Sequence, residues 1–374
     1  MPGRVLAETI EEALDFPIPL VPVGDRLFVL ELFHGPTLAF KDVGARFMAA
    51  LMERLDPEPD RRRVVLVATS GDTGSAVAHA FAGRDRFRVV VLFPAGGVSE
   101  VQRRLFTTLH GNVVAAAVQG DFDACQRLAK EAFRGPDARR LGLTSANSIN
   151  VGRLVPQSFY YAEAMRLGGW GAEGCVFSVP SGNFGNLTGG LLAARLGLPV
   201  RRFIAATNAN DAFHRYLREG VFRPTDTRRT LSNAMDVGDP SNRERIDALF
   251  GGDVREMKAR IWTRSFSDQE TLGCIRRVAA SREYLCDPHT AVGFLGAEAY
   301  RSEHGDEEPV VILSTAHPAK FPEVMERATG RTADPPPRLG SALEGEERLV
   351  DLEPELGALT SLLENVVAGS GVGS

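Results

Sequence analysis

One lysine stands out as a candidate reactive group. The chain has 43 Lys+Arg residues, but only four of them are lysines, at positions 41, 130, 258 and 320. Lys41 ends an apolar run and precedes a segment, Val43–Leu55, whose pattern predicts a helix. Schiff-base chemistry requires a primary amine, because a partly buried lysine can lose its proton near neutral pH and an arginine cannot. A surface lysine at a helix start is the other interpretation, and the run alone does not separate the two.

Two segments rich in glycine and hydroxyl side chains are candidate anion sites. Residues 68–74 have the sequence ATSGDTG, residues 179–186 have the sequence VPSGNFGN, and each follows a predicted strand and opens a predicted helix. Free backbone N–H groups and hydroxyls at such a turn can bind an anion, and glycine lets a phosphate approach closely. Helix capping is the alternative for the first segment. Neither segment is a Walker loop or a GxGxxG dinucleotide motif.

Two further polar segments follow in the chain. Residues 145–153 have the sequence SANSINVGR, in which amides and hydroxyls precede Arg153, as a bound phosphate would require. An arginine paired with a surface acid is the alternative. After the last predicted strand, residues 314–320 have the sequence STAHPAK, where His317 is either a general base or a capping or core histidine. His34 is likewise open between a structural hydrogen bond and a substrate contact.

These segments are connected by an alternation of short apolar strands and amphipathic helices. The pattern predicts strands at 27–33, 64–68, 89–93, 113–118, 175–179, 203–206 and 310–314, and helices at 43–55, 74–82, 98–109, 122–133, 151–167 and 184–196. Such alternation predicts an α/β fold with parallel sheets covered on both faces, and ligands at the carboxyl ends of the strands. We expect two doubly wound α/β domains, a large one from residues 1–56 and 166–374 and a small one from residues 57–165.

Composition excludes several classes of protein. The chain has 374 residues and a formal net charge of −5, and it lacks a basic stripe with interleaved aromatics, which argues against nucleic-acid binding. The four cysteines are scattered, without metal-ligand spacing, so we expect no metal and a reducing compartment. The N-terminus predicts no signal peptide and no segment predicts a membrane span, which favours a cytoplasmic protein. A lysine amine, a phosphate cradle and a second anion site together fit pyridoxal 5'-phosphate acting on an anionic substrate.

Six segments resemble one enzyme family. They are ELFHGPTLAFKD, ATSGDTGSAVAHAF, SANSINVGRL, SVPSGNFGNLTGGLLA, TLSNAMDVGDPSN and STAHPAKF, in this order. From about Leu27 to the C-terminal tail, the chain is similar to the bacterial and fungal branch of the threonine synthase family. The resemblance implies a fold type II pyridoxal-phosphate enzyme, similar to the tryptophan synthase β subunit, with its site between two doubly wound domains. It also implies a lyase that converts O-phospho-L-homoserine and water to L-threonine and phosphate, as a monomer or homodimer.

The resemblance carries the family's site residues to positions in this sequence. The catalytic, cofactor-bearing lysine falls on Lys41, and the hydroxyl that faces the pyridine nitrogen falls on Thr315. The remaining cofactor contacts fall on Asp72, Gly182, Asn183, Phe184, Gly185 and Asn186. The substrate contacts fall on Ser70, Gly71, Asp72, Thr73, Asn147, Ser148, Asn150 and Arg153.

Alternative functions keep the cofactor but change the chemistry. One is another fold type II lyase, such as a dehydratase or a phospho-lyase, and the other is a non-catalytic relative that binds pyridoxal phosphate. The 147–153 loop argues against a dehydratase, which has no substrate phosphate to bind, and an intact Lys41 argues against an inactive relative. Members of the branch usually carry a further N-terminal segment with a Ser-Thr-Arg-Gly signature, which residues 1–26 lack. None of the six motifs lies in that segment, so we expect the chemistry to be retained.

Overall fold

The chain forms two compact units, and each is assembled from separate stretches of sequence. The computed structural model describes residues 3–56, 58, 61–147, 150–305 and 307–369. The first unit comprises Met1–Asp15, Gly35–Arg153 and Pro335–Ser374, and the second comprises Phe16–His34 and Leu154–Asp334.

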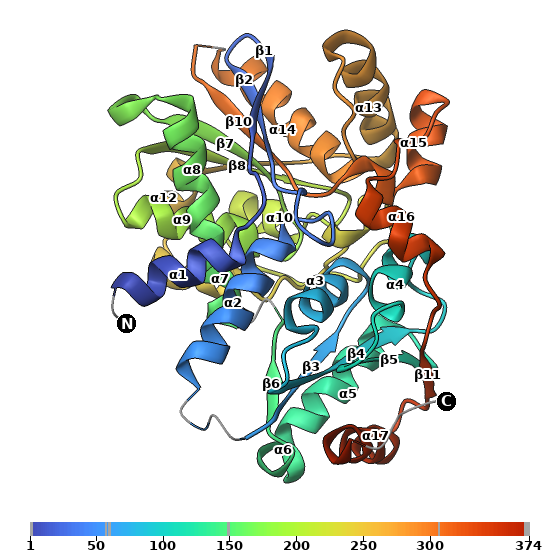
Figure 1. The fold of residues 1–374 in the computed structure, drawn as a ribbon. Helices are drawn as coiled ribbons and strands as arrows, with labels where there is room; N and C mark the ends of the chain where they lie inside the picture. Colours follow the sequence, from blue (N-terminus) through green and yellow to red (C-terminus); the bar gives the residue numbers. More distant parts are fainter. Residues whose placement is uncertain (1–2, 57, 59–60, 148–149, 306, 370–374) are drawn as a thin grey trace. The chain divides into compact units, whose positions relative to one another are not determined.

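The first unit contains a five-stranded parallel sheet in the order β11-β5-β4-β3-β6 (Figure 1). Its strands are β3 (Arg63–Ala68), β4 (Phe87–Pro94), β5 (Val113–Val118), β6 (Leu143–Ser145) and β11 (Val350–Leu352). Its helices are α1 (Gly3–Ala13), α2 (Lys41–Leu55), α3 (Asp72–Phe81), α4 (Glu100–Thr107), α5 (Phe122–Arg134), α6 (Asp137–Arg140), α16 (Pro337–Glu344) and α17 (Leu356–Ala368), and α7 (Val151–Leu154) begins in it.

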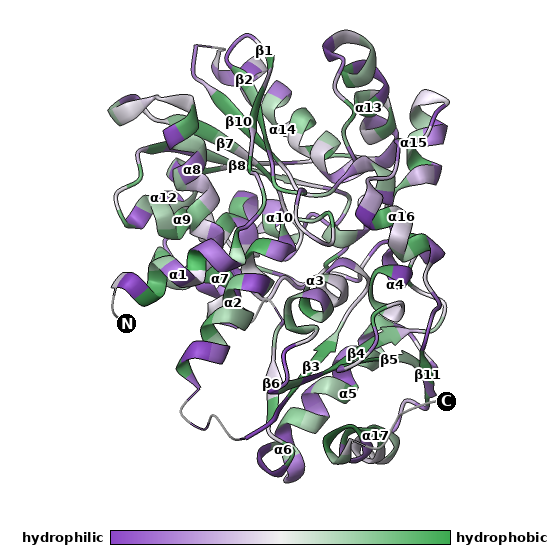
Figure 2. Ribbon diagram, in the orientation of Figure 1, coloured by the Kyte–Doolittle hydropathy of each residue, from purple (hydrophilic) through white to green (hydrophobic). Residues whose placement is uncertain are grey.

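Alternate residues of the strands in this sheet face two layers of helices. Val65 and Val67 of β3 pack with apolar side chains of α2, α3 and α4, whereas Val64 and Leu66 pack with those of α5 and α17. Both faces are therefore buried, which explains the unbroken apolar strands that Figure 2 shows in green.

The second unit contains a six-stranded sheet in the order β1-β2-β10-β7-β8-β9, in which only the β1–β2 pair is antiparallel. Its strands are β1 (Leu20–Gly24), β2 (Leu27–Glu31), β7 (Cys175–Pro180), β8 (Val200–Thr207), β9 (Ile261–Ser265) and β10 (Val310–Ser314). Its α-helices are α8 (Phe159–Gly168), α9 (Gly185–Arg195), α10 (Ala212–Glu219), α11 (Arg243–Leu249), α12 (Val254–Arg260), α13 (Asp268–Arg282), α14 (Pro288–His304) and α15 (Pro322–Thr329). Its 3-10 helices are η1 (Val155–Ser158), η2 (Gly171–Glu173), η3 (Asn233–Met235) and η4 (Pro318–Lys320).

This second sheet is also covered on both faces. Val176 and Ile204 pack in one apolar cluster with side chains of α13, α14 and α15. Phe177 and Phe203 point the other way, where their rings lie 4.8 and 6.0 Å from the ring of Tyr161 in α8. The carboxyl ends of β7 and β10 lead directly into the candidate segments at 181–186 and 315–320.

The two compact units differ from the predicted domain boundaries. Residues 1–15, 35–56 and 335–374 lie in the unit that contains residues 57–153, whereas residues 154–165 lie in the other unit. Helix α2 packs on α1 and α3, β11 pairs with β5, and α17 packs on α5. The C-terminal tail therefore completes the small predicted domain, because its strand and helix extend that sheet and cover its face.

Candidate active site

Lys41 is the first residue of α2 and follows a tightly folded loop. The Thr37 backbone N–H and hydroxyl donate hydrogen bonds of 2.8 and 2.7 Å to the two oxygens of the Asp42 carboxylate. A Cβ on Gly35 would lie 2.5 Å from Asp42 Oδ2, so only glycine allows this approach. Leu38 has a φ of 55°, a left-handed conformation that costs a leucine energy and is characteristic of functional loops. The loop therefore fixes where the α2 N-terminus, and with it Lys41, begins.

Asp72 lies against the Lys41 amine. Lys41 Nζ is 3.5 Å from Asp72 Oδ2, and the two side chains are 16% and 3% exposed. Gln102 of α4 donates a hydrogen bond of 2.9 Å to the other oxygen, Asp72 Oδ1. The sequence analysis did not identify Gln102, which lies 30 residues from Asp72 and belongs to no recognisable motif. This arrangement orients one carboxylate oxygen toward the amine.

The 68–74 turn is capped by one of its own side chains, that of Thr69, which directly follows β3. The Thr69 hydroxyl accepts hydrogen bonds of 2.9 and 2.8 Å from the backbone N–H groups of Gly71 and Gly74. Helix α3 has no side-chain cap at its N-cap residue. Helix capping thus accounts for Thr69, a residue that the capping alternative, which considered Ser70, Asp72 or Thr73, did not name. Ser70 is exposed and Thr73 is partly buried, so both side chains remain near the surface of the turn.

The 145–153 loop uses part of its polarity to build its own turn. Asn150 donates a hydrogen bond of 2.9 Å to the Ser145 carbonyl and accepts one of 2.9 Å from the Gly152 N–H. Asn147 donates to the Ala68 carbonyl at 3.4 Å, which ties this loop to the carboxyl end of β3. Ser148, the remaining predicted phosphate contact, lies outside the described residues.

Arg153 lies beneath this loop rather than at its surface. The residue is 3% exposed, and its Nη1 donates a hydrogen bond of 2.8 Å to the Ala146 carbonyl. Burial lowers the pKa of the guanidinium to about 10, while the negative charge of Asp42 opposes that shift. The group therefore stays charged near neutral pH. The backbone of Arg153 also contacts α2, since a Cβ on Gly44 would lie 2.6 Å from the Arg153 carbonyl oxygen.

In the second unit, the 181–186 turn opens α9. Phe184 has φ 57° and ψ 11°, and its ring packs 4.4 Å from that of Phe213. Asn183 Oδ1 accepts hydrogen bonds from the Ser241 N–H at 2.7 Å and hydroxyl at 3.1 Å. Asn186 Oδ1 accepts from two tyrosine hydroxyls, those of Tyr160 at 2.7 Å and Tyr161 at 2.8 Å. The side-chain oxygens of Asn183 and Asn186 are thus hydrogen-bonded within the protein. The backbone N–H groups at the helix N-terminus are the groups that could bind an anion.

Thr315 and His317 follow β10, and His34 follows β2, the strand that pairs with β10. Thr315 is buried directly after the strand. His317 accepts a hydrogen bond of 3.1 Å from the Ala319 N–H, and burial, together with the charge of His34, lowers the pKa of His317. His34 lies 2.7 Å from Glu31 Oε2. Both histidines therefore have local structural partners.

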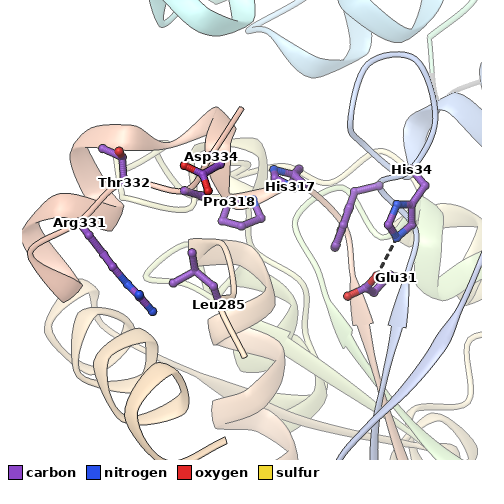
Figure 3. A pocket seen from close by; sticks show the side chains of 10 residues that line it. Glu31, His34, Leu285, His317, Pro318, Arg331, Thr332 and Asp334 are labelled. Atoms are coloured by element: carbon purple, nitrogen blue, oxygen red, sulfur yellow. Dashed lines mark hydrogen bonds and ion pairs between the residues drawn. The ribbon is translucent and has the colours of Figure 1, made fainter. Parts of the chain in front are cut away.

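These histidines also line a cavity within the second unit. It has a volume of about 620 Å³, and Figure 3 shows His34 and Glu31 at one side and Arg331 at the other. Leu285 and Pro318 also line it. The described residues include no group of three or more His, Cys, Asp or Glu side chains that could hold a metal. In the same part of the chain, no helix has the length and hydropathy needed to cross a membrane.

Comparisons with known proteins identify the family. A family model described as pyridoxal-phosphate dependent enzyme matches residues 17–316, and one described as threonine synthase, C-terminal, matches residues 290–363. The threonine synthase of Escherichia coli is 45% identical over 367 residues, 98% of this chain and 84% of the relative. The chain belongs to the threonine synthase family.

Two crystal structures agree with this threonine synthase assignment. The enzyme from Escherichia coli matches with a TM-score of 0.89 at 44% identity, over 98% of this chain and 84% of that one. The pyridoxal-phosphate-bound enzyme from Brucella melitensis matches with a TM-score of 0.91 at 35% identity, over 99% and 85%.

Family membership confirms the predicted fold class, the enzyme class and the dependence on pyridoxal phosphate. The residues of the 181–186 turn fit that cofactor's phosphate. A Cβ on Gly185 would come no closer than 3.5 Å to any atom of the described residues, which is an ordinary van der Waals distance, so the packing of the protein itself does not require a glycine here. Asn186 Nδ2 is buried and has no hydrogen-bond partner in the described part of the chain. A glycine that the packing does not require, beside a buried donor without a partner in the described residues, fits a phosphate bound at the α9 N-terminus of a threonine synthase.

Two glycine substitutions in this turn distinguish packing from ligand approach. Gly185→Ala is expected to weaken pyridoxal phosphate binding at least ~10-fold with little change in stability, because only the ligand needs the space. Gly182→Ala is the comparison variant, since its Cβ would lie 2.5 Å from Met235 Cα. That clash should cost about 1–3 kcal/mol of stability. Cofactor titration and urea unfolding measure the two effects. Equal stability losses in both variants, with normal cofactor affinity for Gly185→Ala, would contradict this assignment of the turn.

Proposed function

We propose that this chain converts O-phospho-L-homoserine and water to L-threonine and phosphate. The observation that carries the proposal is in the first unit, where one fold positions both Lys41 against Asp72 and a buried, charged Arg153 beneath the 145–150 loop. The first pair supplies an amine for cofactor chemistry, and the arginine supplies charge for a phosphate that the substrate brings. Relatives and solved structures named threonine synthase support the same reaction.

The proposed holding groups for pyridoxal phosphate come from four stretches of the chain. Lys41 would attach it covalently, the backbone N–H groups of residues 182–186 would bind its phosphate, the Thr315 hydroxyl would serve its ring nitrogen, and Asp72, which lies against the Lys41 amine, would be near the attachment point. When bound, the cofactor supplies an electron sink for the carbon atoms of the substrate.

Lys41 is proposed to move the protons of the reaction. With the substrate's amine on the cofactor, the free Nζ would take the proton from Cα and one from Cβ, so that the Cγ–O bond can break and phosphate leaves with its electron pair. It would then return protons to Cγ and Cα and assist the addition of water at Cβ. Asp72 Oδ2, 3.5 Å from Nζ, keeps the amine on one side of the turn and stabilises its protonated form. General acid–base assistance of this kind is typically worth ~10²–10⁴ in rate.

The substrate's two anionic groups are proposed to bind separate parts of the first unit. The 70–73 turn receives the carboxylate, through N–H groups at the start of α3 and the hydroxyls of Ser70 and Thr73. Asn147, Ser148, Asn150 and Arg153 receive the phosphate. The structure gives Arg153 a further task, because its hydrogen bond to Ala146 supports the loop that carries the other three residues.

We further propose a cytoplasmic enzyme that acts as a monomer or homodimer. All four cysteines are free and buried, as expected for a reducing compartment.

The test is a turnover assay with O-phospho-L-homoserine. The purified holoenzyme should release phosphate and L-threonine in equal amounts, and it should leave L-serine and L-threonine unchanged. Release of phosphate with a keto acid in place of threonine would favour a phospho-lyase. Deamination of threonine or serine would favour a dehydratase, and no turnover of any of these would favour a binding protein.

A further inference from the structure

A single buried carboxylate in the second unit connects two of the loops that the proposed function assigns to the cofactor. Asp287 precedes α14 and is 0% exposed. Its Oδ2 accepts hydrogen bonds from the His289 backbone N–H at 3.0 Å and from His289 Nδ1 at 2.6 Å. Its Oδ1 accepts from the Thr290 N–H at 3.0 Å and also from the Thr290 hydroxyl. The carboxylate thus fixes two neighbouring side chains that point to different loops.

The first side chain, His289, reaches the segment behind the 181–186 turn. Because Nδ1 donates to Asp287, Nε2 is the acceptor, and the Ala234 backbone N–H donates to it at 3.1 Å. Ala234 lies in η3, whose next residue, Met235, has its backbone against Gly182. A shift of η3 would therefore move the surface on which the phosphate turn rests.

The residue that follows η3, Asp236, is held by a second carboxylate network, although Asp236 itself is only partly buried. Asp236 Oδ1 accepts hydrogen bonds from Asn208 Nδ2 at 2.8 Å, Asn210 Nδ2 at 3.1 Å and the Thr230 hydroxyl at 2.7 Å. Asp236 Oδ2 accepts from the Thr230 N–H at 2.9 Å. The His289 contact adds a second anchor to η3, at its middle residue Ala234.

The second side chain, Thr290, reaches the end of β10. Its hydroxyl has one proton, which it donates to Asp287, so the Ser314 hydroxyl must donate across the 2.9 Å that separates the two oxygens. Ser314 is the last residue of β10 and immediately precedes Thr315. The position of the Thr315 backbone therefore depends on the same carboxylate.

Helix capping alone does not account for this arrangement. Ser267 caps α13 of the same unit through a capping box with Glu270, without any buried imidazole. A cap for α14 needs an acceptor for its first N–H groups, but it needs neither His289 Nε2 nor the Ser314 hydroxyl. We propose that Asp287, with His289 and Thr290, is a positioning residue that holds the phosphate turn and Thr315 in one fixed relation to each other. This inference rests on the proposed function, which places the cofactor's phosphate and ring nitrogen at those two loops.

Two substitutions of His289 test the first connection. In His289→Asn the side-chain amide can replace Nδ1 as the donor to Asp287, but nothing replaces Nε2 as the acceptor for Ala234. We expect pyridoxal phosphate to bind about tenfold more weakly, the loss typical of one buried hydrogen bond, and the phosphorus-31 signal of the bound cofactor to broaden. In His289→Gln the longer side chain returns an acceptor toward Ala234 and should recover most of the affinity. Equal losses in the two variants would overturn the assigned contact, as would unchanged affinity in His289→Asn.

Ser314→Ala tests the second connection, and it removes a single oxygen so that folding is retained. We expect the visible absorbance maximum of the holoenzyme to shift, because Thr315 moves, while cofactor affinity changes less than in His289→Asn. An unchanged absorbance spectrum in Ser314→Ala would overturn this connection. This test does not depend on whether His289→Asn folds. Ser267→Ala is the matched cap control and should alter only thermal stability.

Lys41→Ala separates a failure of the positioning role from a failure of the proposed function. If it loses the lysine-bound absorbance while the His289 and Ser314 variants behave as wild type, only the positioning role is wrong. If it keeps that absorbance, the proposed function itself is wrong.

Discussion

Lys41→Ala is expected to abolish the visible absorbance of the purified holoenzyme and to lower kcat for O-phospho-L-homoserine by at least ~10²–10⁴, because both cofactor attachment and proton transfer are lost. The fold should survive. Lys41 is the first residue of α2, its side chain is 16% exposed, and the loop before it is held by the bonds between Thr37 and Asp42. Absorbance spectroscopy, turnover and thermal unfolding measure these three outcomes on one preparation.

Lys41→Arg is the matched variant, since it keeps a positive charge near Asp72 but offers no amine for covalent attachment. It should be as inactive as Lys41→Ala. Lys130→Ala, an exposed lysine of α5, should behave as wild type. Borohydride reduction would fix the cofactor permanently on the lysine that carries it. Because the chain has only four lysines, peptide mapping then has four possible results. Cofactor recovered on a peptide containing Lys130, Lys258 or Lys320 would refute the assignment of Lys41.

The sequence predicted the interior strands well and the edge strands poorly. The predicted bounds of β5 and β10 agree with the structure, because strands buried on both faces need unbroken apolar runs. The strands that were missed, β1, β6, β9 and β11, are the two edges of each sheet. Edge strands are paired on one side only and tolerate prolines and charges. For this reason the pattern predicted neither β1, which contains Pro22, nor β9, which contains Arg264.

The candidate site shows a similar limit. The sequence identified the polar segments at strand ends, because strand-turn-helix junctions have recognisable glycines and hydroxyls. It did not show which of these polar groups are hydrogen-bonded within the protein. Thr69 caps the 68–74 turn, and Asn150 uses its amide within its own turn. Gln102 went unnoticed because its partner Asp72 is distant in sequence, and Asp287 because its partner Thr290 contacts Ser314, which is distant in sequence.

Arg153→Ala is expected to have the second large effect, on substrate binding and on stability together. Loss of the guanidinium removes the hydrogen bond to the Ala146 carbonyl and a positive charge that interacts with the buried Asp42. A hydrogen bond that involves a charged group contributes about 1.5–3 kcal/mol, so urea unfolding should show a loss of that size. The 145–150 loop then loses both its support and its charge. We expect KM for O-phospho-L-homoserine to rise and phosphate release to slow, with pyridoxal phosphate still bound.

Arg153→Lys and Arg46→Ala separate the two effects of this substitution. Lysine keeps the charge but lacks the planar fork of donors, so it should restore part of kcat/KM and less of the stability. Arg46 of α2 donates hydrogen bonds of 2.8 and 2.9 Å to the carbonyls of Ala13 and Glu12, so its loss also weakens a helix contact in the same unit. Arg46→Ala should lower stability without changing KM. If Arg153→Ala lowers stability to the same extent and leaves kcat/KM unchanged, Arg153 only supports the loop, and the substrate phosphate binds elsewhere.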